Sequence, residues 1–233
     1  MSKAPSLSIV IPSLNEASRL PLLLADLHLW PTPMQLLVVD GGSTDQTKLC
    51  AQLAGAELMQ TLKPGRGQQL ADGARASRGE WLLFLHADSR LPAAWTAAVQ
   101  AVMNTEASNE RAWFFDFRVR EAGPGLRLLE LAVAIRSHLL QRPYGDQGLL
   151  ICRSLYEHIG GYAEIPLMED LDLVERLSKQ NRTKLKGLGL SLTTDDRRWR
   201  QEGLLNRTWQ NAMLRHRWRK GEKASRLAAS YYP

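Results

Sequence analysis

A histidine and an aspartate, His86 and Asp88, stand two residues apart directly after the apolar run Trp81–Leu85. That run has the length and composition of a strand buried on both faces. Polar side chains are costly to bury alone, so an imidazole and a carboxylate at a strand end need a partner. At this spacing both can reach one cleft, where a divalent cation is a natural partner. The pattern predicts a metal site, and the alternative is that Asp88 or Ser89 caps a helix beginning near Leu91.

Three more polar turns follow apolar segments earlier in the chain. They are residues 12–16, 40–45 and 63–67, after predicted strands at 7–11, 35–40 and 56–60. Carboxylates in such turns suit hydroxyl groups and the edge of a base, whereas a Gly-flanked Lys/Arg loop offers backbone N–H groups and positive charge to phosphate. Together, the four turns predict a nucleotide diphosphate site completed by a metal. The Gly-rich signatures of dinucleotide dehydrogenases and of phosphate-loop ATPases do not occur, which counts against both classes.

The elements that must position these turns alternate between strand and helix. Helices are predicted at residues 17–29, 44–54, 67–77 and 93–103, between the strands. Alternation at this spacing predicts an α/β fold with a mostly parallel sheet and helices on both faces. Right-handed crossovers then place every strand-to-helix turn at one edge, beyond the carboxyl ends of the strands, where such sheets bind ligands.

After Asn104 the alternation is less regular. Strands are predicted at residues 111–120, 147–152 and 184–192, and helices at 126–140, 155–161, 167–180 and from 204 onward. The helix at 126–140 is rich in Leu, Ala and Ile and is predicted to be buried in the protein, not in a membrane. In the last helix one stripe is predicted to face the core, formed by Leu205, Trp209, Ala212, Met213 and His216. We expect one domain at 1–200 and a basic helical extension at 201–233 packed on it.

Composition and charge are those of an ordinary soluble protein. The chain has 233 residues, 44% apolar and 23% charged, with no apolar run near the roughly 20 residues that span a bilayer. No signal-peptide pattern is present, so we expect a cytoplasmic protein. Between Arg197 and Arg226 there are ten Arg or Lys residues against two Glu, within a net charge of +6. That segment suits an anionic partner such as a phosphate-bearing substrate, an acidic lipid surface or nucleic acid, and the alternative is a solvated helix face.

The polar turns resemble motifs of the family 2 glycosyltransferases, which have the GT-A fold. The matching segments are Ile9-Val-Ile-Pro-Ser-Leu-Asn-Glu16, Val38-Val-Asp-Gly-Gly-Ser-Thr-Asp45, Lys63-Pro-Gly-Arg-Gly67, Leu83-Phe-Leu-His-Ala-Asp88 and Met168-Glu-Asp-Leu-Asp172. The resemblance covers about residues 7–200, and the Asp-Gly-Gly-Ser-Thr-Asp turn is its most specific piece. It implies a Rossmann-like sheet and an enzyme of the hexosyltransferase type that uses a nucleotide-sugar donor.

The same resemblance implies roles for single residues. Nucleotide-binding residues would be Pro12, Asn15, Glu16, Asp40, Gly41, Lys63, Arg66 and Ala87, with Asp40 reading the base. Asp88 would be the metal-binding acid of the family's Asp-x-Asp motif. Asp170 would be the catalytic base of its Glu-Asp motif, beside Glu169, and the alternative is that both only cap the following helix. Arg198-Trp199 occupies the place of an Arg-Trp pair found in some members.

One departure from the family concerns the metal. His86 stands where the family usually has the first Asp of its Asp-x-Asp motif. A neutral imidazole in place of a carboxylate lowers the negative charge of the site and favours Mn²⁺ over Mg²⁺. We therefore expect a divalent cofactor, Mn²⁺ or Mg²⁺, held by Asp88 and His86. His-Ala-Asp-Ser resembles a small bacterial subgroup of these transferases.

The expected reaction is an inverting transfer from a UDP- or GDP-sugar to an acceptor hydroxyl. Asp170 takes the hydroxyl proton while the oxygen attacks the anomeric carbon, and the metal and the Lys63–Arg66 loop offset the charge of the leaving diphosphate. Asp146 is a candidate acceptor contact, although a turn aspartate accounts for it equally well. The sequence does not identify the acceptor, and our hypothesis is a lipid-linked or anionic one held by the basic segment at the inner face of the membrane.

Two other functions fit parts of the sequence. A sugar-phosphate nucleotidyltransferase shares the sheet type and the metal, but it needs a Gly-rich, Arg-containing loop after the first strand, where this chain has Pro-Ser-Leu-Asn-Glu. A basic module for nucleic acid or membrane would use Trp199, Trp209 and Trp218 among the arginines. We expect no nucleic-acid partner, because the helical spacing of Trp209 suits core packing better.

Overall fold

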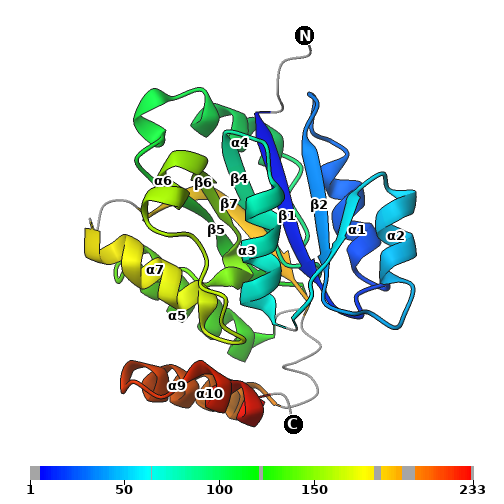
Figure 1. The fold of residues 1–233 in the computed structure, drawn as a ribbon. Coiled ribbons are helices and arrows are strands. Elements are labelled where there is room, and N and C mark those ends of the chain that lie inside the picture. Colours follow the sequence, from blue (N-terminus) through cyan, green and yellow to red (C-terminus); the bar gives the residue numbers. More distant parts are fainter. Residues whose placement is uncertain (1–5, 64, 121–122, 181–184, 196–202, 232–233) are drawn as a thin grey trace.

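The computed structural model describes residues 6–63, 65–120, 123–180, 185–195 and 203–231. In these residues a seven-stranded sheet has the order β3-β2-β1-β4-β6-β5-β7, and helices cover both of its faces (Figure 1). The strands are β1 (Leu7–Ser13), β2 (Gln35–Asp40), β3 (Glu57–Gln60), β4 (Trp81–Phe84), β5 (Ala112–Val119), β6 (Leu149–Cys152) and β7 (Leu185–Thr194). Among them β6 alone runs antiparallel to its neighbours β4 and β5. The predicted mostly parallel α/β sheet is confirmed.

The helices alternate with the strands in the first half of the chain, as predicted. They are α1 (Leu20–Leu27), α2 (Thr47–Leu53), α3 (Arg66–Ala76), α4 (Trp95–Met103), α5 (Pro124–His138), α6 (Arg153–His158), α7 (Glu169–Gln180), α9 (Leu204–Arg219) and α10 (Ala224–Tyr231). Short 3₁₀ turns form at η1 (Glu106–Ser108) and η2 (Gly145–Gln147). The sequence did not predict α10 as a separate helix.

Two apolar cores lie on opposite faces of the sheet. Every residue of β1, β2 and β4 is buried, because helices cover both faces of these central strands. One core joins the strands to α1 and α4, where Trp30 and Trp95 stack with their ring centroids 5.2 Å apart. The other joins them to α3, α6 and α7. The sheet is therefore fixed from both sides, and its edge is a stable platform for the polar loops.

The antiparallel strand β6 brings a second set of loops to that edge. In the register Phe84 lies opposite Leu149, so the start of β6 meets the end of β4. The turn η2, directly before β6, therefore lies beside the residues that follow β4. Parallel strands alone would have placed η2 at the far edge of the sheet.

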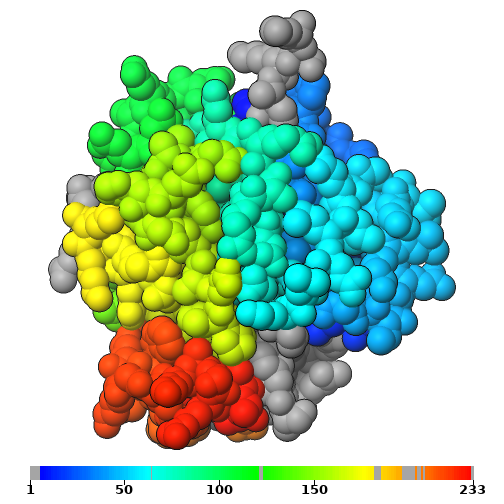
Figure 2. Space-filling model, in the orientation of Figure 1, coloured from blue at the N-terminus to red at the C-terminus, as the bar shows by residue number. Residues whose placement is uncertain are grey.

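The C-terminal helices form a layer against the start of α7. Leu214 of α9 and Leu227 of α10 are buried in a cluster with Leu167, Met168 and Leu171. Figure 2 shows this segment, in red, directly against the yellow and yellow-green surface of the preceding residues. The predicted packing of a helical extension on the rest of the chain agrees with these contacts.

Two predictions of burial were wrong. In α5 the sheet takes up one face, through Val133, while the opposite apolar face is open to solvent, with Leu128 68% and Leu131 57% exposed. In α9 the predicted core stripe from Trp209 to His216 is also exposed, with Trp209 68% exposed, and the side chain of Leu205 lies outside the described part. The buried side of α9 carries Leu214 and the partly buried Trp218, because these contact α7 and α10. No helix in the described residues is both long enough and apolar enough to cross a membrane.

Gly73 is the point at which α3 touches the sheet. A Cβ at this position would lie 2.4 Å from Cγ1 of Val10 and 2.9 Å from Cγ2 of Val39. Leucine gains about 1 kcal/mol of helix propensity over glycine. Overpacking in a filled core typically costs about 1–3 kcal/mol, and here a whole side chain has no space.

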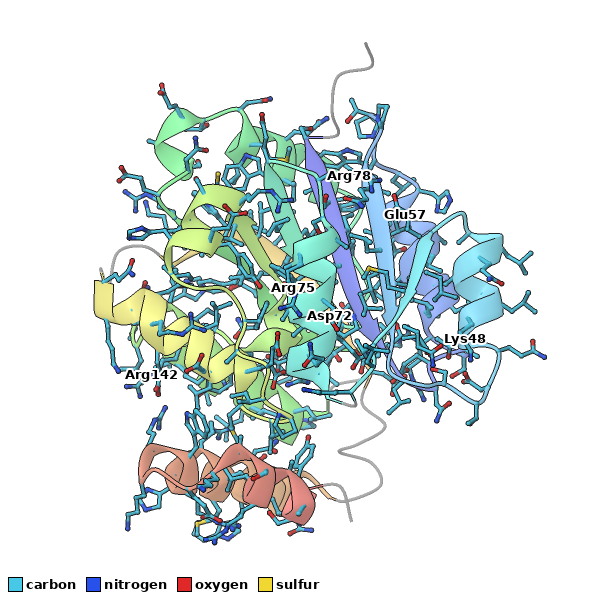
Figure 3. All side chains as sticks on the ribbon, viewed as in Figure 1. Lys48, Glu57, Asp72, Arg75, Arg78 and Arg142 are labelled. Carbon is cyan, nitrogen blue, oxygen red and sulfur yellow. The ribbon has the colours of Figure 1, made fainter. Side chains whose placement is uncertain are left out.

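We therefore expect Gly73→Leu to lower the free energy of unfolding by about 2 kcal/mol or more in urea titrations. The matched control is Arg75→Leu on the same helix, where the side chain lies on the surface (Figure 3) and is 59% exposed. The control is expected to change stability by less than about 1 kcal/mol. Equal effects of the two substitutions would contradict the proposed contact.

Candidate active site

A cavity of about 690 Å³ opens at the edge of the sheet where the parallel strands end. Its wall combines the loops after β1, β2 and β4 with η2, the start of α7, and the inner sides of α5, α9 and α10. Cavities of this size accommodate molecules as large as a nucleotide sugar. Of the residues predicted to act here, the wall contains Pro12, Glu16, Gly41, Arg66, His86, Ala87, Asp88, Asp146 and Asp170.

Four other predicted residues do not line this cavity. Asn15 and Asp40 lie within the neighbouring turns, Lys63 is exposed to solvent, and Glu169 is fully buried behind the wall. Arg198-Trp199 lies outside the described residues.

Asn15 and Asp40 instead shape the loops after β1 and β2. The carboxylate of Asp40 accepts hydrogen bonds from the backbone N–H groups of Gly42 and Ser43, both at 3.0 Å. Asn15 adopts a left-handed conformation (φ 55°), and its Oδ1 accepts a hydrogen bond from the N–H of Thr44 at 2.9 Å. These contacts fix the loop after β1 to the loop after β2. The cavity wall here is formed by their neighbours.

Asp170 is held at the start of α7 by contacts from two other segments. The N–H of Gly145 donates a hydrogen bond to its Oδ2 at 2.8 Å, and Nη2 of Arg66 lies 3.6 Å from the same oxygen. Burial favours the neutral carboxyl group, but Arg66, the Gly145 N–H and the nearby His86 outweigh it and hold the pKa of Asp170 below its ordinary value. Asp170 is therefore ionised at neutral pH.

The adjacent carboxyl group, Glu169, has a different environment. It is fully buried and pairs through Oε1 with Nε of Arg66, while its Oε2 is buried with no hydrogen-bond partner among the described residues. Burial raises the pKa of Glu169, with Asp170 adding to the shift and Arg66 opposing it. Glu169 thus anchors Arg66 from behind the wall, and Asp170 faces the cavity.

Two glycines allow the backbone to approach closely at this point. A Cβ on Gly145 would lie 2.7 Å from Nε2 of His86 and 3.0 Å from Oδ2 of Asp170. A Cβ on Gly67, in the first turn of α3, would lie 2.3 Å from the carbonyl oxygen of Ile165. The absence of side chains at these two positions lets η2 and the segment before α7 lie against the residues that follow β4 and β3.

The predicted metal ligands lie on the same wall. The described residues contain no group of three His, Cys, Asp or Glu side chains arranged to hold a metal by themselves. His86 and Asp88 both line the cavity, and one or two protein ligands suffice when substrate phosphates complete the coordination. The donor set fits a divalent cation that binds together with a diphosphate.

Several residues line the opposite side of the wall, and of these only Arg215 is a basic residue of the segment that the sequence analysis linked to an anionic acceptor. Arg136 from α5, Tyr144 before η2, and Thr208, Asn211 and Arg215 from α9 all line the cavity. The sequence did contain one signal for Arg136. It is the single charged residue in segment 131–137, and the five residues before it are all apolar. The α9 residues gave no such signal, since their helix carries arginines on several sides.

Comparison with known proteins gives a family match over the first half of the chain. Residues 8–118 match the model of "Glycosyl transferase family 2". A PGL/p-HBAD biosynthesis glycosyltransferase of Mycobacterium bovis is 37% identical over 102 residues, covering 41% of this chain and 40% of the relative. An uncharacterised glycosyltransferase of Mycobacterium tuberculosis is 33% identical over 88 residues, 38% of this chain and 39% of its own length. The chain spans about two fifths of the length of these curated relatives.

Solved structures share the fold over most of the chain. TarS of S. aureus, residues 1–349, superposes with a TM-score of 0.65 at 16% identity, covering 82% of this chain and 60% of that one. Glucosyl-3-phosphoglycerate synthase of Mycobacterium tuberculosis, in complex with Mn²⁺, UDP and phosphoglyceric acid, gives 0.60 at 19% identity, covering 80% and 69%. At these identities the likeness shows the fold, which is of the GT-A type.

The lowered pKa of Asp170 makes a prediction about acid stability. A carboxyl group whose folded-state pKa lies below its unfolded value of about 4 stabilises the fold above that value, and the contribution is lost as the pH falls through the folded pKa. We expect the difference in free energy of unfolding between the wild type and Asp170→Asn to be constant from pH 7 to about 5 and to change below about pH 4, in the direction of lost wild-type stability. Urea titrations across this pH range measure the difference in free energy of unfolding. A difference that is independent of pH would contradict the lowered pKa of Asp170.

Proposed function

We propose that the chain is a member of glycosyltransferase family 2 and an inverting enzyme that moves a sugar from a nucleotide-diphosphate sugar to an acceptor hydroxyl. The observation that carries the proposal is one cavity lined by His86, Asp88 and Asp170, from three separate loops. The family match over residues 8–118 supports the reaction class, and the residues on the wall support the assignment of roles.

The proposed chemistry depends on an ionised carboxylate beside an open space. Asp170 accepts the proton of the acceptor hydroxyl while that oxygen forms a bond to the anomeric carbon and the bond to the diphosphate breaks. Attack opposite the leaving group inverts the anomeric centre. The Gly145 N–H and Arg66 orient the Asp170 carboxylate and keep it charged before the reaction.

We further propose a donor end at the loops that carry Pro12, Glu16 and Gly41. Arg66 and His86 line the same cavity as these loops and Asp170. When bound, a divalent metal at Asp88 and His86 would supply positive charge to the departing diphosphate. Solved structures of the fold support a UDP-sugar donor, since TarS is known in complex with UDP-GlcNAc and the synthase with Mn²⁺ and UDP.

The roles of Asp40, Asn15 and Glu169 are proposed in a narrower form, and no role is proposed for Lys63. Asp40 and Asn15 act by holding the donor loops, through the hydrogen bonds to Ser43 and Thr44. Glu169 acts by holding Arg66. We also propose that residues 1–200 are the transferase domain and that 201–233 are an extension whose helices complete the acceptor side of the cavity, as the lining by Asn211 and Arg215 supports.

Asp170→Asn tests the base. The amide keeps the shape of the side chain but cannot accept the proton, so we expect sugar transfer to fall about 10²–10⁴-fold while UDP binding stays within a few-fold of the wild type. The matched control is Asp172→Asn in the same helix, where the carboxylate pairs with Arg176 at 2.6 Å. Normal turnover of Asp170→Asn would show that another group is the base.

Asp88→Ala tests the metal. In a thermal-shift experiment with UDP at about 100 times its Kd, ligand binding should add about 2.7 kcal/mol of stability to the wild type. We expect the part of this gain that requires Mn²⁺ to disappear in Asp88→Ala and to persist in the control Asp72→Ala, on α3 (Figure 3). An undiminished Mn²⁺ effect in Asp88→Ala would overturn the metal assignment. Formation of pyrophosphate from a nucleoside triphosphate and a sugar phosphate would instead indicate a nucleotidyltransferase.

A further inference from the structure

We propose that the side of the cavity opposite the nucleotide loops binds an anionic group of the acceptor, a phosphate or carboxylate, between the guanidinium groups of Arg136 and Arg215. The inference rests on the proposed function, since it assumes that the cavity receives an acceptor. It names the acceptor class: a hydroxylated molecule that carries a negative charge close to the hydroxyl that is glycosylated.

Arg136 is held in place by neutral partners. Its Nε donates a hydrogen bond to the carbonyl oxygen of Arg142 at 2.9 Å, and its Nη2 donates one to Oε1 of Gln147 at 3.1 Å. Gln147 is itself fixed, because its Nε2 donates to the carbonyl oxygen of Phe115 at 3.0 Å. The guanidinium is therefore oriented at the cavity wall without a carboxylate neutralising it through a direct contact.

Arg215 reaches the same place from a different helix. The Cζ of Arg136 lies 3.8 Å from the ring centroid of Tyr144, and the Cζ of Arg215 lies 5.5 Å from the same centroid. Within the described part of the chain, neither guanidinium forms an ion pair with a carboxylate within 4.0 Å. Two cations thus lie against one aromatic ring on the wall of the cavity.

The electrostatic cost of this arrangement is visible in Arg136. Burial lowers the pKa of Arg136, the nearby Asp146 opposes that shift, and Arg215 adds to it because the two charges repel. An anion placed between two guanidinium groups removes the repulsion and accepts charge-assisted hydrogen bonds from both. Phosphate and carboxylate are the groups whose geometry matches these donors.

A buried polar atom lies near both Arg136 and the proposed base. Asp146 lines the cavity, and its Oδ1 is buried without a hydrogen-bond partner among the described residues. Its neighbour Gly145 donates to Asp170, so the chain places Asp146 next to the site of proton transfer. A free carboxylate oxygen here suits a hydroxyl group of the acceptor. An acceptor with an anionic end and a hydroxyl end matches both features.

The other arginines of α9 provide a comparison. Arg217 pairs with Glu222, with Nη2 and Oε1 2.6 Å apart, and Arg219 lies 3.3 Å from Glu175 through Nε and Oε1. Neither lines the cavity. Surface pairing therefore accounts for both, whereas Arg215 contacts the Tyr144 ring and the cavity.

The test measures binding of glycerol 3-phosphate, glycerate and glycerol to the full chain by calorimetry, in the presence of UDP and Mn²⁺. We expect the two anions to bind at least tenfold more tightly than glycerol. Arg215→Gln should lose at least tenfold in anion affinity, Arg215→Lys should recover part of it, and the control Arg219→Gln should retain it. Melting temperatures without ligand verify that each variant is folded.

A second arm identifies the source of the anion. Sedimentation with phosphatidic acid vesicles, compared with phosphatidylcholine vesicles, measures whether a lipid phosphate binds in an Arg215-dependent way. Arg215-dependent binding in either arm supports the anion site, and the arm in which it occurs distinguishes a soluble acceptor from a lipid one. Equal affinity for glycerol 3-phosphate and glycerol, or no effect of Arg215→Gln in both arms, overturns it. Failure of the wild type to bind any UDP- or GDP-sugar would instead remove the proposed function, because donor binding does not involve Arg215.

Discussion

The geometry of the site depends on the contacts that Arg66 makes with two carboxylates. Arg66 contacts two consecutive carboxylates, Glu169 and Asp170, that begin a helix 103 residues further along the chain. Two neighbouring buried carboxyl groups repel each other and resist ionisation. Arg66 contacts both groups, and their pKa values shift in opposite directions. Glu169 lies behind the wall with a raised pKa, whereas Asp170 has a lowered pKa and stays charged at the surface of the cavity. Without Arg66, the start of α7 would hold uncompensated buried charge.

The parts of the fold that are determined locally could be predicted from the sequence. The strand at Trp81–Phe84 and the polar residues after it are an apolar run with an abrupt end, and the parallel sheet follows from the alternation of such runs with helices. His86, Asp88 and Asp170 therefore share one cavity as the sequence analysis expected. Their chemical roles remain proposals that the substitutions above test.

What could not be predicted depends on partners distant in the sequence. Asp40 and Asn15 have the residue types of a binding site, but their oxygens accept hydrogen bonds from backbone N–H groups of the turn after β2. The exposed face of α5 and the outward position of Trp209 depend on which side the sheet and α10 occupy, and a helical stripe alone does not specify that side. Arg215 is one of many arginines in α9 until Tyr144 and the cavity distinguish it. The family match also ends at residue 118, before Tyr144, Asp170 and α9, so the residues on the acceptor side lie beyond it.

Gly67 has a mechanical consequence. Because this position has no side chain, the carbonyl oxygens of Ala163 and Ile165 lie where a Cβ would be, at 2.5 and 2.3 Å. The segment that leads into α7 therefore packs on the first turn of α3, and α3 packs on β1 and β2 at Gly73. Close contacts at these two glycines therefore connect the centre of the sheet, through α3, to the segment that leads to Asp170. Any larger residue at position 67 would have to displace the backbone that leads to Asp170, although it would remove no polar group from the pocket.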